Sequence, residues 1–266
     1  MVTQVAKLLR PKSIAITLSE GEKISYTQDR RDFLKTTAVV AGITIAPGVL
    51  LYSISAAKPA NEAVTSKVRW GMLIDTTKCT EGCDACVSVC ATEHGITEEV
   101  PDEIMPRWIR KVGLRDKQTG KEYSLPIMCQ HCEHPPCVDV CPTGASFKRA
   151  NGIVLVDKHV CIGCRYCMMA CPYKARSFVH ETLENQKPHT PRGKGTVEAC
   201  TLCVHRVDEG QSPACVEACN KTGHKAMLFG DMNDPNSDIS KKLSEVGSTV
   251  LRADMHLNPG IRYQGL

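Results

Sequence analysis

Four cysteines fall within the eleven residues of the stretch CIGCRYCMMAC, residues 161–171, and a proline follows the last of them. Two thiols are enough for a disulfide, and four thiols on two loops can hold one zinc ion. Three thiols at steps of three residues on a single loop need a larger partner. The stretch therefore indicates a metal centre larger than one ion.

The 266-residue chain has sixteen cysteines, and they form four sets of four with none left over. Aromatic residues make up only 5% of the chain. We therefore expect no large aromatic core, and expect centres bound by the thiols to stabilise much of the fold. In chain order the sets are Cys79, Cys83, Cys86 and Cys90; Cys129, Cys132, Cys137 and Cys141; Cys161, Cys164, Cys167 and Cys171; and Cys200, Cys203, Cys215 and Cys219.

The third set has the spacing C-x2-C-x2-C-x3-C-P, the run that binds a [4Fe-4S] cluster in bacterial ferredoxins. Such a cubane takes four thiolates at the corners of a tetrahedron. A tight loop brings three of them, and we expect the fourth cysteine, at the start of the helix that follows, to reach toward a neighbouring cluster. Each set then serves two clusters, and Pro142 and Pro172 redirect the chain after the second and third sets.

The other sets keep the closing C-x3-C and differ in one gap, which is four residues in the second set and eleven in the fourth. In the first set an extra residue between Cys79 and Cys83 requires a bulge, so its cluster is expected to be the least secure. An alternative of another class is a structural zinc or disulfide scaffold without a redox role, because an isolated C-x2-C pair is typical of zinc sites.

The formal charge of +4 is too small and too evenly spread for a nucleic-acid-binding protein, which needs a concentrated basic stripe. We find no nucleophile motif, no phosphate-binding loop and no open metal triad in the sequence. The chain is therefore expected to move single electrons and to have no substrate-converting site of its own.

Residues 1–57 are predicted to be an export segment. The run RRDFLK, residues 30–35, is a twin-arginine pattern, and an uncharged stretch follows it to Ala57, where we expect cleavage. A retained anchor is the alternative, because a bilayer crossing needs about 20 residues. The twin-arginine route exports proteins already folded around a cofactor. It therefore favours clusters over disulfides and predicts a location at the periplasmic face of the cytoplasmic membrane.

The remaining residues, 58–266, are predicted to form an α+β domain of short hairpins and loops held together by clusters. Asn151-Gly152 lies between two short apolar runs, which is a hairpin signal. Residues 106–129 favour a second, looser hairpin. Residues 184–200, rich in proline, glycine and lysine, favour a surface loop.

The combination of CQHCEHPPCVDVCPTGA, CIGCRYCMMACPY and CTLC resembles the four-cluster iron-sulfur subunits of the complex iron-sulfur molybdoenzymes, of polysulfide reductase and of related quinone-reactive complexes. The likeness covers about residues 69–266. It implies two interleaved units that resemble bacterial 2[4Fe-4S] ferredoxins. Residues 129–180 are then the inner unit, and residues 70–128 with 181–266 are the outer unit and C-terminal tail.

The resemblance also implies how the sets share clusters, with the first paired with the fourth and the second with the third. Each cluster takes three cysteines from one set and the last from its partner. The implied ligand groups are Cys79, Cys83, Cys86 and Cys219; Cys200, Cys203, Cys215 and Cys90; Cys129, Cys132, Cys137 and Cys171; and Cys161, Cys164, Cys167 and Cys141.

Within this family, the export signal, CNKTGHKAMLFGD after the fourth set and the ending LRADMHLNPGIRYQGL look most like the DsrO-type subunits of the DsrMKJOP complex. The resemblance implies a membrane-bound complex linked to dissimilatory sulfur metabolism. The expected partners are an NrfD-type quinone-reactive membrane subunit and a multihaem cytochrome c or other redox subunit. The alternative within redox chemistry is the electron subunit of a molybdopterin oxidoreductase of the dimethyl sulfoxide or polysulfide reductase type.

Several other polar residues flank the cysteines. Arg165, Lys174 and Arg176 surround the third set and either raise its reduction potential or form a solvated surface. His131 and His134 lie between cysteines of the second set, and we expect hydrogen bonds near the cluster there instead of ligation.

The charge of the loaded protein differs from that of the bare chain. Residues 58–266 carry 26 lysines and arginines against 25 aspartates and glutamates, a formal charge of +1. Four cubanes at roughly −2 each would bring the protein to about −7. We therefore expect a basic or haem-edge docking surface on its partner.

Overall fold

The computed structural model describes residues 64–96, 101, 104–184 and 186–266. All of them belong to one compact unit, Ala57–Leu266. The twin-arginine pattern and the predicted cleavage at Ala57 lie outside the described residues. In the part of the chain that the structure describes, none of the helices is both long and apolar enough to cross a membrane.

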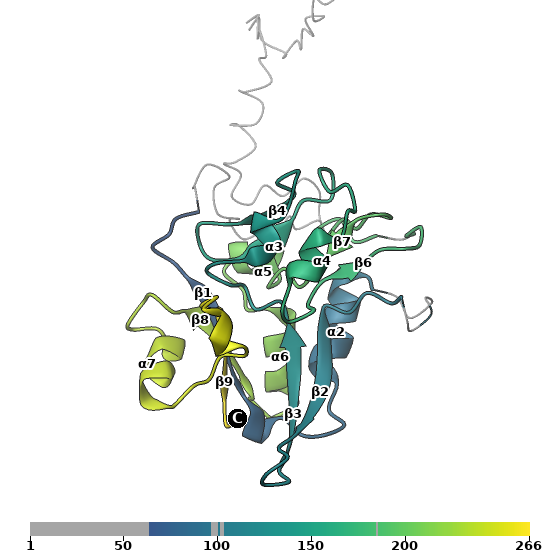
Figure 1. Ribbon diagram of the computed structural model, residues 1–266. Coiled ribbons are helices and arrows are strands. Elements are labelled where there is room, and N and C mark those ends of the chain that lie inside the picture. Colours follow the sequence, from purple (N-terminus) through teal and green to yellow (C-terminus); the bar gives the residue numbers. More distant parts are fainter. Residues whose placement is uncertain (1–63, 97–100, 102–103, 185) are drawn as a thin grey trace, which may run out of the picture. The chain divides into compact units, whose positions relative to one another are not determined.

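The two ends of the described domain meet in one sheet. Strand β1 (Trp70–Asp75) lies between β8 (Met227–Asp231), which is antiparallel to it, and β9 (Ile261–Gln264), which is parallel to it (Figure 1). The middle of β1 and the alternate residues of β9 are apolar and fully buried. The C-terminal segment is thus packed against the start of the domain.

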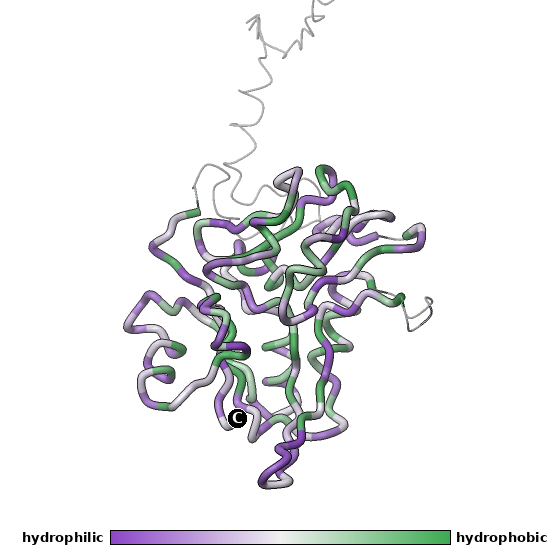
Figure 2. The backbone as a smooth tube through the Cα atoms, viewed as in Figure 1, coloured by the Kyte–Doolittle hydropathy of each residue, from purple (hydrophilic) through white to green (hydrophobic). Residues whose placement is uncertain are grey.

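Both predicted hairpins are confirmed. Strands β2 (Ile109–Arg115) and β3 (Glu122–Met128) pair along their whole length, and their hydrophilic tip projects from the fold (Figure 2). Strands β4 (Ser146–Lys148) and β5 (Val154–Val156) pair around the Asn151-Gly152 turn, where Gly152 has a φ of 87°. Glycine adopts this positive φ without steric cost.

The helices are short, and four of them carry cysteines. Helix α2 contacts α6, and α3 contacts α4, so the helices of the first and fourth sets pack together, as do those of the second and third. The helices are α2 (Ala85–His94), α3 (Pro136–Asp139), α4 (Tyr166–Ala170), α5 (Val204–Asp208), α6 (Ala214–Lys221) and α7 (Asp238–Glu245). The remaining short elements are η1 (Thr76–Lys78), β6 (Ser177–Phe178), β7 (Val197–Glu198) and η2 (Ala253–Met255).

The prediction of a surface loop at residues 184–200 is wrong for part of that segment. Arg192 and Glu198 form a buried ion pair at 2.8 Å, with side chains 3% and 0% exposed. Arg192 also donates to the carbonyl of Gly95 just beyond α2. Although its composition is typical of loops, this segment contains a buried ion pair and is hydrogen-bonded to the residue that follows α2. We call residues 186–200 the strap segment.

Eleven of the sixteen cysteines are buried, which places them among the apolar side chains of the core. Many aliphatic side chains share this core, whereas its buried aromatic members among the described residues are Trp108, Tyr173 and Tyr263. The core of this domain therefore combines thiols with aliphatic side chains.

Candidate metal centres

The third cysteine of each set lies in the helix of that set, and the fourth lies four residues later. Cys86 and Cys90 are both inside α2, and Cys215 and Cys219 are both inside α6. Cys171 follows α4 directly. The expectation that the fourth cysteine begins a following helix is thus wrong. Because four residues span about one turn, one helix presents two thiols stacked along its axis.

The structure brings cysteines of different sets together. We name each group after the set that supplies three of its members. The groups follow the ligand sets that the resemblance implies. Group 1 is Cys79, Cys83, Cys86 and Cys219; group 2 is Cys129, Cys132, Cys137 and Cys171; group 3 is Cys161, Cys164, Cys167 and Cys141; group 4 is Cys200, Cys203, Cys215 and Cys90.

Group 1 assembles around Cys86. Burial raises the pKa of Cys86 to about 11, the positive charge of Lys111 opposes the rise, and Cys79, Cys219 and Cys83 add to it. In group 4, burial raises the pKa of Cys200 well above its usual range, and Cys90, Cys215 and Cys203 raise it further. The last cysteines of the first and fourth sets are thus exchanged between the two groups.

Group 2 lines one small cavity, with all four of its cysteines in the wall together with Tyr173 and Arg176. Burial raises the pKa of Cys132 to about 12, and the other three thiols of the group add to the rise. In group 3, Cys167 interacts with Cys161 and Cys141, while Cys164 is exposed on the same loop.

The residues present fit iron-sulfur clusters. None of the sixteen cysteines, all within the described residues, is joined in a disulfide. Buried thiols packed this closely resist deprotonation, because neighbouring thiolates repel one another in a medium of low polarity. Iron cations would supply the missing positive charge and hold the ligands as thiolates.

Backbone amides already point at several of the sulfur atoms. Such N–H donors are typical of thiolates that ligate iron, and they help to set the reduction potential. The amides of Ala226, Leu202, Ser146 and Val197 donate to Sγ of Cys219, Cys200, Cys141 and Cys161 at 3.2, 3.4, 3.3 and 3.4 Å.

Two cationic side chains also contact cysteines. Lys111 on β2 donates from Nζ to Cys79 Sγ at 2.9 Å. Arg176 donates from Nη2 to Cys137 Sγ at 3.0 Å. Sequence reasoning singled out Arg176 and missed Lys111, which lies on the predicted hairpin far from the third set.

The two histidines of the second set lie in different surroundings. His131 is buried and accepts a hydrogen bond at Nδ1 from the amide of Val154, and His134 is exposed. Sequence reasoning missed His94, whose Nε2 lies 3.5 Å from Cys203 Sγ and whose ring packs on Trp108. Burial lowers the pKa of His94 and of His131 to about 3, so both imidazoles are neutral in the folded protein at neutral pH.

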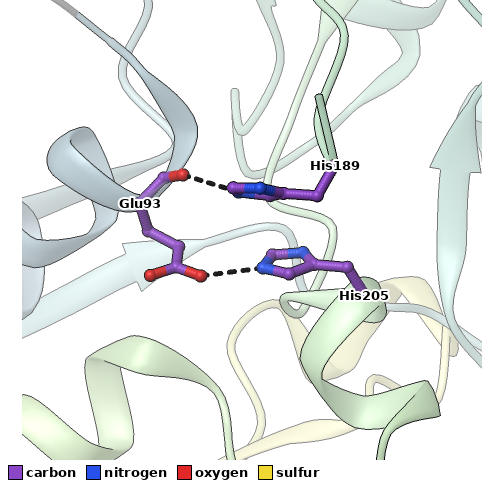
Figure 3. Close-up of side chains that lie close together, drawn as sticks. All are labelled: Glu93, His189 and His205. Carbon is purple, nitrogen blue, oxygen red and sulfur yellow. Dashed lines mark hydrogen bonds and ion pairs between the residues drawn. The ribbon is translucent and has the colours of Figure 1, made fainter. Parts of the chain in front are cut away.

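Beside His94, three side chains from separate segments lie close together: Glu93 at the end of α2, His189 in the strap segment and His205 on α5 (Figure 3). His205 Nε2 lies 2.8 Å from the Glu93 carboxylate, and His189 Nε2 lies 2.9 Å from the Glu93 carbonyl oxygen. The two rings pack against each other at a tilt of 33°, with centroids 4.2 Å apart. These contacts join the strap segment, α2 and α5 beside Cys203.

The four groups follow one another in the order 1, 4, 2, 3. Cys86 of group 1 interacts with Cys90 of group 4, Cys200 of group 4 with Cys129 of group 2, and Cys137 of group 2 with Cys167 of group 3. The partly or fully exposed cysteines are Cys79, Cys83, Cys141, Cys161 and Cys164, and all of them belong to the terminal groups.

The two ends of this order have different surroundings. Beside group 1 lies an open cavity of about 790 Å³, lined by Cys79, Cys83, Lys111 and charged residues of the β2–β3 hairpin. Near group 3 several large apolar side chains are exposed, together with the charged side chains of Asp139, Arg165 and Lys174. The apolar ones include Val140, Phe147, Val160, Ile162, Tyr166 and Met169.

Comparisons with known proteins agree with this chemistry. A family model described as a 4Fe-4S dicluster domain matches residues 121–232. The chain is 43% identical to the Hdr-like menaquinol oxidoreductase iron-sulfur subunit 1 of Archaeoglobus fulgidus, over 89% of this chain and 98% of that protein. It is 35% identical to a subunit of tetrathionate reductase from Salmonella typhimurium, over 91% and 90% of the two chains. It is 37% identical to the protein NrfC of Escherichia coli, over 82% and 87%.

Proposed function

Since the chain belongs to the family of iron-sulfur subunits of oxidoreductases with a 4Fe-4S dicluster domain, we propose that it transfers electrons through four [4Fe-4S] clusters. The observation that supports this proposal is that the last cysteine of each set lies among thiols of its partner set: Cys219 near Cys86, Cys171 near Cys132, Cys141 near Cys167 and Cys90 near Cys200. A disulfide scaffold needs only pairs. Sixteen thiols in four groups supply four thiolates for each cubane.

The proposed ligands of each cluster are the members of groups 1 to 4. When bound, the clusters supply one-electron chemistry. The chain's own residues bury the inner groups from water, donate hydrogen bonds to the ligand sulfurs and leave the terminal groups near the surface. We propose two interleaved ferredoxin-like units, with groups 2 and 3 in residues 129–180 and the packing of α2 on α6 uniting the outer unit.

The order of the groups supports a linear path for electrons, which a redox partner can reach at group 1 or at group 3. Near group 3 the exposed apolar side chains, among them Ile162 and Met169 at 66% and 74% exposure, support a protein contact at that end, because large apolar side chains exposed together mark interaction sites. We propose an NrfD-type quinone-reactive membrane subunit as the partner at that end. The open cavity beside group 1, whose lining includes charged residues, suits a second redox subunit, such as a multihaem cytochrome c.

The proposed location is the periplasmic face of the cytoplasmic membrane, supported by the twin-arginine pattern at residues 30–35. A link to dissimilatory sulfur metabolism is supported by the DsrO-like sequence after the fourth set and at the C-terminus. The family likeness to an iron-sulfur subunit named for a menaquinol oxidoreductase supports a quinone-linked complex.

A second candidate is the electron subunit of a molybdopterin oxidoreductase. The likeness to subunits named for tetrathionate reductase and for a putative dimethyl sulfoxide reductase favours it. Purification of the tagged protein with its native complex separates the two candidates. A co-purifying large subunit that contains molybdenum would replace the first candidate with the second, whereas a membrane subunit with a haem protein and no molybdenum supports the first.

The decisive test of the cofactor is the content of iron and acid-labile sulfide per chain in anaerobically purified protein, with electron paramagnetic resonance of the reduced sample. Four cubanes require about sixteen of each. About twelve would mean that one group fails to hold its cluster, and the bulged first set is the first suspect. Zinc in place of iron would end the electron-transfer proposal in favour of the structural scaffold.

A further inference from the structure

Arg176 occupies an unusual position for an arginine. It follows the third set by five residues, yet its side chain is buried, and the whole residue is only 6% exposed. Arginine is almost never fully buried unless its charge is paired. Among the described residues, Arg176 forms no ion pair with a carboxylate. Its countercharge must therefore come from another source.

The guanidinium of Arg176 lies close to cysteine thiols. Nη2 donates to Cys137 Sγ at 3.0 Å and to Ser146 Oγ at 2.7 Å. The strongest electrostatic partners of Arg176 after its own burial are Cys137, Cys129 and Cys167. Cys137 and Cys129 belong to group 2, whereas Cys167 belongs to group 3. The single positive charge thus acts on two neighbouring groups of ligands.

Two nitrogen atoms of the guanidinium are buried without a partner. Neither Nε nor Nη1 has a hydrogen-bond acceptor within the described part of the chain. An unmade hydrogen bond from a buried charged group is costly. Arg176 also lines the small cavity formed by the four cysteines of group 2. Unused donors beside that cavity suit sulfur acceptors of a cluster held there.

The other two cations of this region do not share this position. Lys174 is exposed, and Arg165 is exposed with its guanidinium carbon 3.8 Å from the centroid of the Phe178 ring. Solvent screens charges at such positions far more than buried ones. Of the three cations singled out in the sequence, Arg176 alone is buried against cysteine ligands.

We propose that Arg176 is a positioning residue shared by the clusters of groups 2 and 3, where it raises the reduction potential of both. The inference rests on the proposed function. A reduced cluster carries one more negative charge than an oxidised one, so a nearby buried cation stabilises the reduced form. Because one cation faces both groups, it also offsets part of the repulsion between two reduced neighbours.

Potentiometric titration followed by electron paramagnetic resonance tests this assignment in the full-length holoprotein. The variants are Arg176→Gln, Arg176→Met and Arg176→Lys, with Arg165→Gln as the matched control because it removes one positive charge from the same region. Iron, sulfide and far-ultraviolet circular dichroism are measured first. We expect the neutral Arg176 variants to shift two of the four midpoint potentials to more negative values, and Arg176→Lys to shift the same two by less.

The control is expected to leave all four potentials within error of the wild type. Full cluster content with unchanged potentials in the neutral variants would overturn the proposal, as would equal shifts in all four clusters. If neither neutral variant retains its clusters, Arg176→Lys decides the matter. Loss of the clusters in this charge-retaining variant too would overturn a role of the positive charge, whereas full cluster content with potentials close to those of the wild type supports it. Failure of the proposed function is distinguishable, since the wild type would then contain no iron.

Discussion

At the scale of single residues, the side chains that contact sulfur divide into charged and neutral donors. Lys111 and Arg176 bring positive charge to groups 1 and 2. Beside group 4, neutral His94 lies next to Cys203. A cation stabilises a reduced cluster more than a neutral donor does. We therefore expect the potentials along the chain to be uneven, with the two ends of the order tuned separately.

The substitution Lys111→Met tests whether the positive charge of Lys111 raises the reduction potential of the cluster proposed for group 1. Methionine retains much of the side-chain volume and removes the charge and the hydrogen bond to Cys79 Sγ. We expect one midpoint potential to fall while the pair influenced by Arg176 stays unchanged, as measured by potentiometric titration with electron paramagnetic resonance. Arg115→Gln is the control, because Arg115 lies on the same strand with its side chain 73% exposed. A fall of the same size in the control would show that Lys111 has no special role.

Residue-level prediction from sequence is most direct where spacing carries the chemistry. Cysteine spacing defines the four sets, because three proposed ligands of each cluster belong to one set, whereas the fourth comes from a distant set. It could not identify Lys111 or His94, since Lys111 reaches Cys79 across 32 residues and His94 reaches Cys203 across 109. For Arg176, sequence could not separate a buried position from a solvated one, because burial depends on the neighbours that the fold supplies.

At the scale of elements, local signals predicted the two hairpins, and a local signal misled at residues 184–200. The hairpin of β4 and β5 depends on the Asn151-Gly152 turn and its immediate neighbours, so the local sequence is sufficient to predict it. The burial of Arg192 depends on Glu198 and on the distant carbonyl of Gly95. Composition cannot reveal such a contact.

The strap segment is expected to be intolerant of losing one partner of its buried ion pair. Arg192→Met leaves the Glu198 carboxylate buried without its partner, which typically costs about 3–5 kcal/mol of unfolding free energy. The double variant Arg192→Met with Glu198→Leu removes both charges and is expected to recover much of that loss. The measurement is the temperature at which the protein loses its cluster absorbance on heating under argon.

The exposed pair Lys242 and Glu245 provides the comparison for that experiment, since their side chains are 44% and 64% exposed. Exposed pairs contribute about 0–1 kcal/mol, so Glu245→Gln should hardly change the transition. If Arg192→Met were equally harmless, the strap would have no role in holding α2 beside the fourth set.

At the scale of the whole molecule, the fold depends on what the thiols hold. The buried core contains eleven cysteines, and the helices that carry six of them are four to ten residues long. Isolated helices shorter than about 12 residues are marginal in water. We therefore expect removal of iron with a chelator under oxidising conditions to abolish most of the helical circular dichroism, and anaerobic reconstitution with iron and sulfide to restore it. A chain that keeps its full signal without iron would show that the apolar core is sufficient.

The charge of the loaded molecule makes a second prediction at this scale. The bare chain from residue 58 is nearly neutral by sequence, whereas four cubanes would make it acidic at about −7. A basic monohaem cytochrome c is a suitable probe of the resulting field. We expect the rate at which the reduced protein reduces this probe to fall between about 0.01 and 0.1 M salt, because the Debye length shortens from about 30 to about 10 Å. A neutral redox dye should show little dependence. A rate that is constant or rises with salt for the cytochrome would mean that basic residues dominate the exposed ends of the wire, and the partner surface would then have to be acidic.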